Sequence, residues 1–479
     1  MNNIDNVFKY FKEISKIPRE TSKEKQISDY LVNFAKERYL EVVQDNLFNV
    51  TIKKKSSIKN YSGPAVILQG HMDMVYEKAA DSGHIYENGI EVIERDGFLY
   101  ANKTTLGADN GIALAYCLAV LDSDEIKHPD LEIIITSQEE GGLAGAQSIN
   151  TDNIKGKFLI NLDSEEEGVF FTSCAGGVRN YVRIPAEKEE IKCDIMLSIN
   201  ISGLKGGHSG LEIDLERGNA IKLMGRLLYK INSPDIHLLS VQSAGKANAI
   251  PNKAAALLAI PENMIDEIKS TIEKIETSFS KELKFSDDIR IDTEISNCSK
   301  TTISYTDDAK NKIIKTLMLI PYGVMNKNLA MPGLVQTSSN VGSLDENEKD
   351  ISILSSIRSS VESQKYNVAD TIKVIASLNG AQCDFFNDYP QWEYKAESKL
   401  RDMAVNIYEE TFGKKARLTA IHAGLECGYF YNKLNDVDII SMGPDLFEVH
   451  TANEHAGIES IKNVWILLIK LLEKLSAEA

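Results

Sequence analysis

Short apolar runs alternate with amphipathic stretches in the first third of the chain and again in its last fifth. Three of these runs have the length and composition of buried strands: 65–69, 131–135 and 158–162. Residues 112–121 are apolar on nearly every side, as expected of a buried helix. The dipeptides Asn88-Gly89 and Asp96-Gly97 indicate hairpin turns. Strands that alternate with helices predict an α/β fold, in which helices cover both faces of a mostly parallel sheet.

The pattern changes near residue 194, where apolar and polar positions begin to alternate as they do in half-exposed strands. Two successive segments with a similar order of predicted strands and helices follow. We interpret them as ferredoxin-like βαββαβ units, at about 194–288 and 289–390. The first pattern then returns. We therefore predict a discontinuous domain, made of residues 1–193 and 391–479, with an α+β domain inserted at 194–390.

Two adjacent glutamates, Glu139 and Glu140, follow the predicted strand at 131–135 and precede a pair of glycines. They therefore lie at the carboxyl end of a strand, where open α/β sheets bind ligands. Because adjacent side chains cannot occupy one position, two roles are natural: one glutamate binds a ligand and the other moves a proton. A solvated acidic turn is the simpler interpretation of the pair taken alone.

More acidic and imidazole residues follow other predicted strands or begin a predicted helix. With the glutamates they form one set: His71, Asp73, Asp109, Glu139, Glu140, Asp163 and His450. Crowded carboxylates raise one another's pKa, and a divalent cation resolves that conflict. Histidine and carboxylate ligands without cysteine suit zinc, manganese or cobalt, but not calcium. Two such ions can share one carboxylate at a separation of about 3.5–4 Å.

These motifs and their order resemble those of the M20 family of dinuclear metallopeptidases. The matching segments are His71 with Asp73, residues 107–111, residues 139–141, Asp163, and His450 with Thr451. Four longer segments are similar to the cytosolic aminoacyl-histidine dipeptidases of that family, the Xaa-His or PepD type: 70–75, 161–166, 206–210 and 422–428. The resemblance covers the whole chain. It implies a dinuclear-zinc peptidase-like catalytic domain, with the inserted domain as its lid.

The resemblance also implies which residues hold the metals. Asp109 would bridge both ions and would be joined to Asn110 by a cis peptide bond. The other ligands would divide into two pairs: His71 with Asp163, and Glu140 with His450. The expected cofactors are two divalent cations, with Zn²⁺ as the first choice and Mn²⁺ or Co²⁺ as alternatives.

The remaining implied roles concern catalysis and the substrate. Glu139 would be the general base and later the acid, and Asp73 its supporting acid, placed to orient the imidazole of His71. His208, in the lid, would polarise the substrate carbonyl, although a solvent-exposed loop histidine is the simpler interpretation. Asn248 and Arg358 would bind the C-terminal carboxylate of the substrate, with His422 and Gly424 near that pocket. Without the resemblance, Arg358 is a structural arginine on a strand and Asn248 a turn residue.

Composition narrows the classes of partner. The chain has 479 residues, and its 53 basic and 70 acidic residues give a net charge of −17. This surplus argues against binding to nucleic acid or to anionic membranes. The six cysteines contain no C-x-x-C pair, which favours free thiols in a reducing cytoplasm. No targeting segment is visible. We expect a cytoplasmic protein that is a monomer, or a homodimer paired through the lid.

The leading hypothesis is a dinuclear metallo-dipeptidase that acts on small unblocked dipeptides of the Xaa-His type, such as carnosine. Other reactions of the same scaffold come next, namely aminotripeptidase action or the deacylation of N-acyl amino acids. A non-catalytic metal-binding interaction protein is the alternative from another class. The presence of Glu139 argues against that alternative, because a binding site needs Glu140 but not its neighbour.

Overall fold

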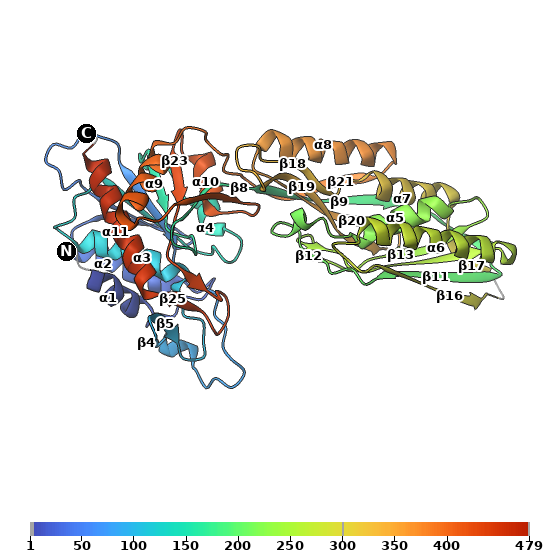
Figure 1. Cartoon of the computed structure of the whole chain (residues 1–479), viewed down its shortest axis with the longest axis horizontal. Helices are drawn as coiled ribbons and strands as arrows, with labels where there is room; N and C mark the ends of the chain where they lie inside the picture. The colour runs from blue at the N-terminus through green and yellow to red at the C-terminus, as the bar shows by residue number, and fades with distance from the viewer. Residues whose placement is uncertain (1–3, 299–300, 478–479) are drawn as a thin grey trace. The chain divides into compact units, whose positions relative to one another are not determined.

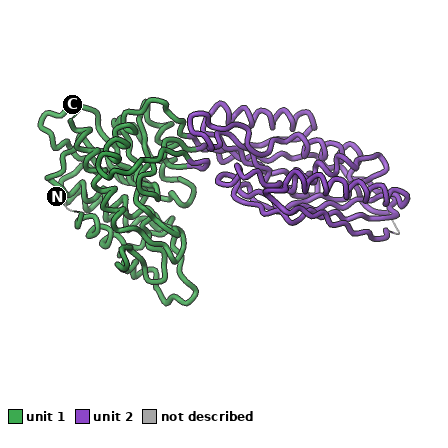
Figure 2. The backbone as a smooth tube through the Cα atoms, in the orientation of Figure 1, with its two compact units in different colours: residues 1–174, 392–420, 425–479 green, residues 175–391, 421–424 purple. Residues whose placement is uncertain are grey.

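The computed structural model describes residues 4–298 and 301–477. The chain divides into two compact units (Figure 2): unit 1 consists of Met1–Cys174, Trp392–Ala420 and Leu425–Ala479, and unit 2 of Ala175–Gln391 and Ile421–Gly424. Each unit has its own hydrophobic core. The insertion begins at Ala175, ahead of the boundary at residue 194 that the sequence pattern suggests. The reason is that β9 (Gly176–Pro185) pairs with strands of unit 2.

Unit 1 is built on an eight-stranded sheet with the order β1-β2-β6-β3-β7-β23-β8-β22. Its strands are β1 (Glu41–Gln44), β2 (Val50–Lys54), β3 (Val66–His71), β6 (Leu131–Thr136), β7 (Phe158–Asn161), β8 (Val169–Cys174), β22 (Arg417–Ile421) and β23 (Asp438–Ser441). The central strands β6, β3, β7 and β23 are parallel, and β2 and β1 continue the sheet in antiparallel fashion. The predicted α/β fold with a parallel sheet at its centre is confirmed.

Helices pack on both faces of this sheet. They are α1 (Ile4–Ile14), α2 (Lys25–Glu37), α3 (Ala108–Asp122), α4 (Ala144–Ser148), α9 (Lys399–Phe412), α10 (Glu426–Lys433) and α11 (Ile458–Ser476). On one face, α3 and α11 lie side by side, where the ring of Tyr116 stacks on Trp465 (Figure 1). Gly70 of β3 faces α3, where a Cβ would lie 2.8 Å from the Cβ of Ala113. Because side chains alternate along a strand, the neighbouring Gln69 points to the other face of the sheet, where its amide donates a hydrogen bond to Glu426 at the start of α10.

A smaller four-stranded sheet completes unit 1, with the order β24-β25-β5-β4. Its strands are β4 (Val92–Arg95), β5 (Phe98–Ala101), β24 (Leu446–Phe447) and β25 (His455–Gly457). The Asp96-Gly97 turn joins β4 to β5, as predicted. The hairpin predicted at Asn88-Gly89 is wrong, because that dipeptide ends the 3₁₀ turn Tyr86–Asn88.

Unit 2 contains two larger antiparallel sheets, ordered β13-β15-β11-β16 and β18-β19-β20-β9-β21. Their remaining strands are β11 (Ile195–Ser202), β13 (His237–Gln242), β15 (Ala254–Ile260), β16 (Arg290–Asn297), β18 (Gly323–Lys327), β19 (Val335–Glu346), β20 (Asp350–Ser359) and β21 (Gln382–Tyr389). Two short pairs are β10 (Lys188–Lys192) with β17 (Thr301–Tyr305), and β12 (Gly207–His208) with β14 (Ala249–Ile250).

The helices of unit 2 are α5 (Ala220–Ile231), α6 (Ile265–Glu282), α7 (Asp307–Leu319) and α8 (Glu362–Leu378). One core joins its elements, with Ile199 of β11, Leu227 of α5 and Ile353 of β20 among its members. The predicted division of the insertion into two repeated units stays a prediction. Among the described residues of both units, no helix combines the length and the apolar character that crossing a membrane requires.

Candidate metal centre

Three adjacent parallel strands bring the candidate ligands to one edge of the unit 1 sheet. His71 is the last residue of β3 and is aligned with Thr136, the last residue of β6. Glu139 and Glu140 lie in the turn that follows β6, and Asp163 follows the end of β7. Because these strands are parallel, their carboxyl ends meet at one edge, which is the usual binding edge of an α/β sheet.

Asp109 stands between two imidazole rings. Its Oδ1 lies 3.1 Å from Nε2 of His71, and its Oδ2 lies 3.1 Å from Nε2 of His450. The peptide bond from Asp109 to Asn110 is cis, as the resemblance implies. An aspartate that turns one oxygen toward each of two histidines has the arrangement of a carboxylate shared by two cations.

Two further carboxylates complete the set on either side of Asp109. Oδ1 of Asp163 lies 3.5 Å from Nε2 of His71, and Oε1 of Glu140 lies 2.6 Å from Nε2 of His450. Ligand atoms of His71, Asp109 and Glu140 all lie within 4.8 Å of one another. The structure thus forms two groups, each with one imidazole and one carboxylate, which share Asp109. Nitrogen and oxygen donors in these groups fit two divalent cations of the zinc type.

The electrostatics of the cluster also favour bound cations. Burial, opposed by His71 but reinforced by Asp109 and Glu140, raises the pKa of Asp163 to about 6. Burial also raises the pKa of Glu139 well above its ordinary value. For Asp109, hydrogen bonds to the two imidazoles outweigh burial and lower the pKa of the carboxyl. A divalent cation would relieve the repulsion among these carboxylates.

Asp73 fixes the turn that carries both glutamates. Its carboxylate accepts hydrogen bonds from the N–H groups of Glu139 and Glu140, at 3.0 and 3.2 Å, and from the hydroxyl of Thr21 at 2.9 Å. Nδ1 of His71 lies 3.1 Å from the backbone oxygen of Asp73 and 3.5 Å from its Oδ1. The backbone of Asp73 therefore orients the imidazole more directly than its carboxylate does.

Three fully buried charged residues near the site have no role in the sequence analysis: Arg19, Glu426 and Glu454. Glu426 lies behind the cluster, where its Oε2 accepts hydrogen bonds from the amide of Gln69 at 2.5 Å and the hydroxyl of Thr136 at 2.8 Å. Burial raises the pKa of Glu426 to about 7. Arg19 and Glu454 bind backbone groups, and such contacts leave no local pattern in a sequence.

The other predicted residues lie in unit 2, where His208, Arg358 and His422 gather around Gly210. A Cβ at Gly210 would lie 2.7 Å from the backbone oxygen of His422, 3.1 Å from Cε1 of His208 and 3.2 Å from Nε of Arg358. Nδ1 of His208 accepts hydrogen bonds from the N–H groups of Gly210 and Leu211, at 3.2 and 3.0 Å. The ring proton of a neutral His208 therefore sits on Nε2.

Arg358 is a buried cation on β20. Its Nη1 donates a hydrogen bond to the hydroxyl of Tyr389 at 3.0 Å, and its buried Nε has no hydrogen-bond partner among residues 4–298 and 301–477. The side chain of Asn248 is exposed, and its backbone oxygen accepts a hydrogen bond from the N–H of Ser209 at 2.9 Å. Gly424 ends the short segment that unit 2 takes from the last part of the chain.

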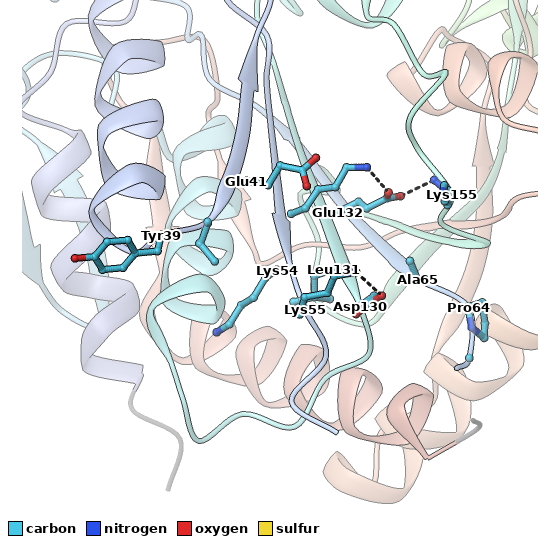
Figure 3. Close-up of a pocket in the computed structure, with 13 residues that line it drawn as sticks. Tyr39, Glu41, Lys54, Lys55, Pro64, Ala65, Asp130, Leu131, Glu132 and Lys155 are labelled. Carbon is cyan, nitrogen blue, oxygen red and sulfur yellow. Dashed lines mark hydrogen bonds and ion pairs between the residues drawn. The ribbon is translucent and has the colours of Figure 1, made fainter. Parts of the chain in front are cut away.

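A cavity of about 790 Å³ lies at the opposite end of β6 (Figure 3). It is lined by Tyr39, Leu40, Glu41, Lys53, Lys54, Lys55, Gly63, Pro64, Ala65, Asp130, Leu131, Glu132 and Lys155. Four of its charged groups form two ion pairs: Lys53 lies 3.2 Å from Glu132, and Lys55 lies 3.5 Å from Asp130. None of the lining residues belongs to the metal cluster, so we assign this cavity no part in the chemistry.

Known proteins are similar to this chain in sequence and in fold. The cytosol non-specific dipeptidase of Escherichia coli (strain K12) is 32% identical over 471 residues, which are 98% of this chain and 97% of that protein. The crystal structure of the aminoacylhistidine dipeptidase from Vibrio alginolyticus superposes with a TM-score of 0.93 at 34% identity, covering 98% of this chain and 96% of that one.

A tripeptidase of Staphylococcus aureus shares the fold, with a TM-score of 0.59 at 16% identity and 100% of both chains covered. The family model described as peptidase family M20/M25/M40 matches residues 67–474. The match spans every member of the metal cluster, and the chain belongs to peptidase family M20/M25/M40.

Proposed function

We propose that this protein is a metallo-dipeptidase, which uses two divalent cations to hydrolyse the peptide bond of unblocked dipeptides. The observation that carries the proposal is the position of Asp109, with one oxygen 3.1 Å from His71 and the other 3.1 Å from His450. The names of the Escherichia coli and Vibrio relatives, both dipeptidases, support dipeptides as the substrate class. Within that class we favour dipeptides of the Xaa-His type.

The ligands would divide around Asp109 as the contacts suggest, His71 and Asp163 on one side and Glu140 and His450 on the other. Zn²⁺ is the expected metal, with Mn²⁺ or Co²⁺ as alternatives. Cations bound there would bring the pKa of a water molecule to about 7 and polarise the scissile carbonyl. Side chains of the protein would carry out the proton transfers and bind the substrate.

Glu139 is the general base and acid of the proposed reaction. Its backbone N–H is held by Asp73, on the same turn as Glu140. It therefore lies next to a ligand without belonging to the cluster of His71, Asp109 and Glu140. A carboxylate in that position can accept the proton of the attacking water and deliver it to the leaving amine.

His208 and Arg358 would bind the substrate. A neutral His208 with its proton on Nε2 can donate a hydrogen bond to the oxyanion that forms at the carbonyl carbon. Arg358 would pair with the C-terminal carboxylate of the dipeptide, which is supported by its burial and by its Nε, which has no hydrogen-bond partner in the described part of the chain. We place Asn248, His422 and Gly424 in the same subsite.

The relative from Escherichia coli is a cytosol enzyme by name, which supports a cytoplasmic location for this chain. We expect a small dipeptide as its only obligatory partner, with neither nucleic acid nor membrane involved. A monomer and a homodimer paired through the inserted domain are both compatible with this function.

A substrate panel tests the proposal. The protein, loaded with Zn²⁺ and in a second series with Mn²⁺, is assayed with carnosine, Gly-Gly-Gly and N-acetyl amino acids. We expect turnover of the dipeptide and little turnover of the other two. Activity on the tripeptide alone would indicate an aminotripeptidase, and activity on the acetylated set alone a deacylase. Metal binding without turnover of any substrate would favour the interaction protein.

A further inference from the structure

Arg19 and Glu454 both bind the main chain of the turn that carries Asp109. Their side chains are almost completely buried, with exposed fractions of 1% and 2%. The carboxylate of Glu454 accepts hydrogen bonds from the N–H groups of Gly107, Ala108 and Asp109, at 2.8, 2.8 and 3.2 Å. One side chain therefore fixes three successive backbone donors just before the cis peptide bond.

The guanidinium of Arg19 binds backbone oxygens of the same region. Its Nη1 donates hydrogen bonds to the carbonyl oxygens of Met72 at 3.0 Å and of Asp73 at 3.3 Å, and its Nη2 donates to that of Gly107. Arg19 thus joins the segment after β3 to the turn that carries Asp109. A planar guanidinium suits this position because its donors point in fixed directions.

The glycines beside Asp109 provide an independent observation. A Cβ at Gly107 or at Gly111 would lie 2.6 Å from Nη2 of Arg19. Gly107 also has a φ of +70°, which residues with a Cβ rarely adopt. The residues on both sides of Asp109 therefore leave the room that a buried arginine needs.

We propose that Arg19 and Glu454 are positioning residues, which hold the backbone of Asp109 so that one carboxylate oxygen faces each imidazole and the site retains a pair of cations. This inference rests on the proposed metal-dependent function. Neither residue is a metal ligand in that scheme. Groups that orient metal ligands typically change metal affinity by about 10–100-fold when they are replaced.

The test compares E454Q with a matched control, E132Q. Glu132 is also buried, 4% exposed, and accepts hydrogen bonds from the N–H groups of Lys155 and Gly156, both at 2.8 Å. It lies at the other end of β6, beside the cavity (Figure 3). Zn²⁺ is titrated into the full chain in competition with a chromophoric chelator. We expect E454Q to bind Zn²⁺ about 10–100-fold more weakly than wild type, and E132Q to bind it with wild-type affinity.

Wild-type affinity in E454Q, or an equal loss in E132Q, would overturn the positioning role. If E454Q does not fold, R19K carries the test, because lysine keeps the charge but lacks the planar set of donors. We expect R19K to show weaker Zn²⁺ binding, with the KM for the dipeptide unchanged, and unaltered Zn²⁺ affinity would overturn the role. Wild type that binds fewer than two Zn²⁺ would instead count against the proposed function itself, on which the inference depends.

Discussion

The turn after β6 points the side chains of two adjacent glutamates to different places, and we therefore propose different roles for them. Glu140 reaches His450 at 2.6 Å, whereas Glu139 stays outside the cluster of metal-ligand atoms. Both backbone N–H groups are held by Asp73. The two glutamates can therefore be exchanged for glutamine one at a time without removing the support of the turn.

The pair E139Q and E140Q should separate proton transfer from metal binding. We expect E139Q to retain its metal and to lose about 10²–10⁴-fold in kcat, because a general base contributes roughly that much. E140Q should lose bound metal. Metal content after dialysis and steady-state kinetics measure both effects, and E139Q with the kcat of wild type would show that Glu139 is not the base.

His422 should make the protein less stable in mild acid. Burial, and next the charge of Arg358, lower the pKa of His422 to about 3. In the unfolded chain this pKa is about 6.5, so protons bind preferentially to the unfolded state below that value. Stability is unaffected above pH ~6.5 and falls as the pH decreases toward 3, by at most about 1.4 kcal/mol per pH unit from this residue.

Urea unfolding of wild type and H422Q between pH 7 and pH 4.5, in the presence of EDTA, measures this effect. The difference in unfolding free energy between the two proteins should shift in favour of H422Q as the pH decreases. A difference that stays constant with pH would mean that His422 is not held in its neutral form.

Most of the candidate metal ligands could be proposed from the sequence because they follow a buried strand or begin a buried helix, and His450, which does neither, was proposed from the family resemblance. The apolar run of β3, for example, ends at His71. Arg19 and Glu454 were not predictable. Their partners are backbone groups of residues 72–73 and 107–109, and main-chain contacts between distant segments carry no residue-type signal.

At the level of elements, the strand β23 and the loop after β7 are packed so closely that a glycine is required between them. A Cβ at Gly443 would overlap the backbone carbonyl of Ser164, and it would lie 3.1 Å from the N atom of the same residue. Ser164 directly follows Asp163, which we propose as a metal ligand. Backbone cannot move aside as a flexible side chain can, so a methyl group here must displace the loop.

G443A should therefore destabilise the protein by about 1–3 kcal/mol, as overpacking does, and weaken metal binding through Asp163. The control is G83A, since a Cβ at Gly83 would meet no atom within 4 Å. Exposed positions of that kind change stability by about 0.5 kcal/mol or less. Urea unfolding and Zn²⁺ titration measure both effects. Equal stability of the two variants would contradict the close packing at Gly443.

Element prediction succeeded where a local pattern decides the structure and failed where a distant partner does. The helix at 112–121 and the Asp96-Gly97 turn follow from their own residues. Gly89 instead lies against the backbone of Lys16, and the N–H of Ile90 donates a hydrogen bond to the backbone oxygen of Ser15 at 2.7 Å, so the Asn-Gly dipeptide there contacts a distant segment and forms no hairpin. The start of unit 2 at Ala175 was missed for the same reason, because β9 is assigned to a unit by its pairing with β20 and β21.

For the whole molecule, the two separate cores predict that the metal stabilises only part of the chain. The candidate ligands all belong to unit 1. Zn²⁺ at 100 times its dissociation constant adds about 2.7 kcal/mol to the unit that binds it. Calorimetry should show one transition that Zn²⁺ shifts upward and another that it leaves in place. In D109N the shift should disappear. Equal shifts of all transitions would contradict the assignment of the metal to unit 1.

A crystal structure of the Zn²⁺-loaded protein, with anomalous diffraction recorded on both sides of the zinc absorption edge, addresses the bridging role of Asp109. Two zinc peaks should appear about 3.5–4 Å apart. Oδ1 of Asp109 should contact the peak beside His71 and Asp163, and Oδ2 the peak beside Glu140 and His450. A single peak, or two peaks of which only one touches Asp109, would contradict a dinuclear site built around this carboxylate.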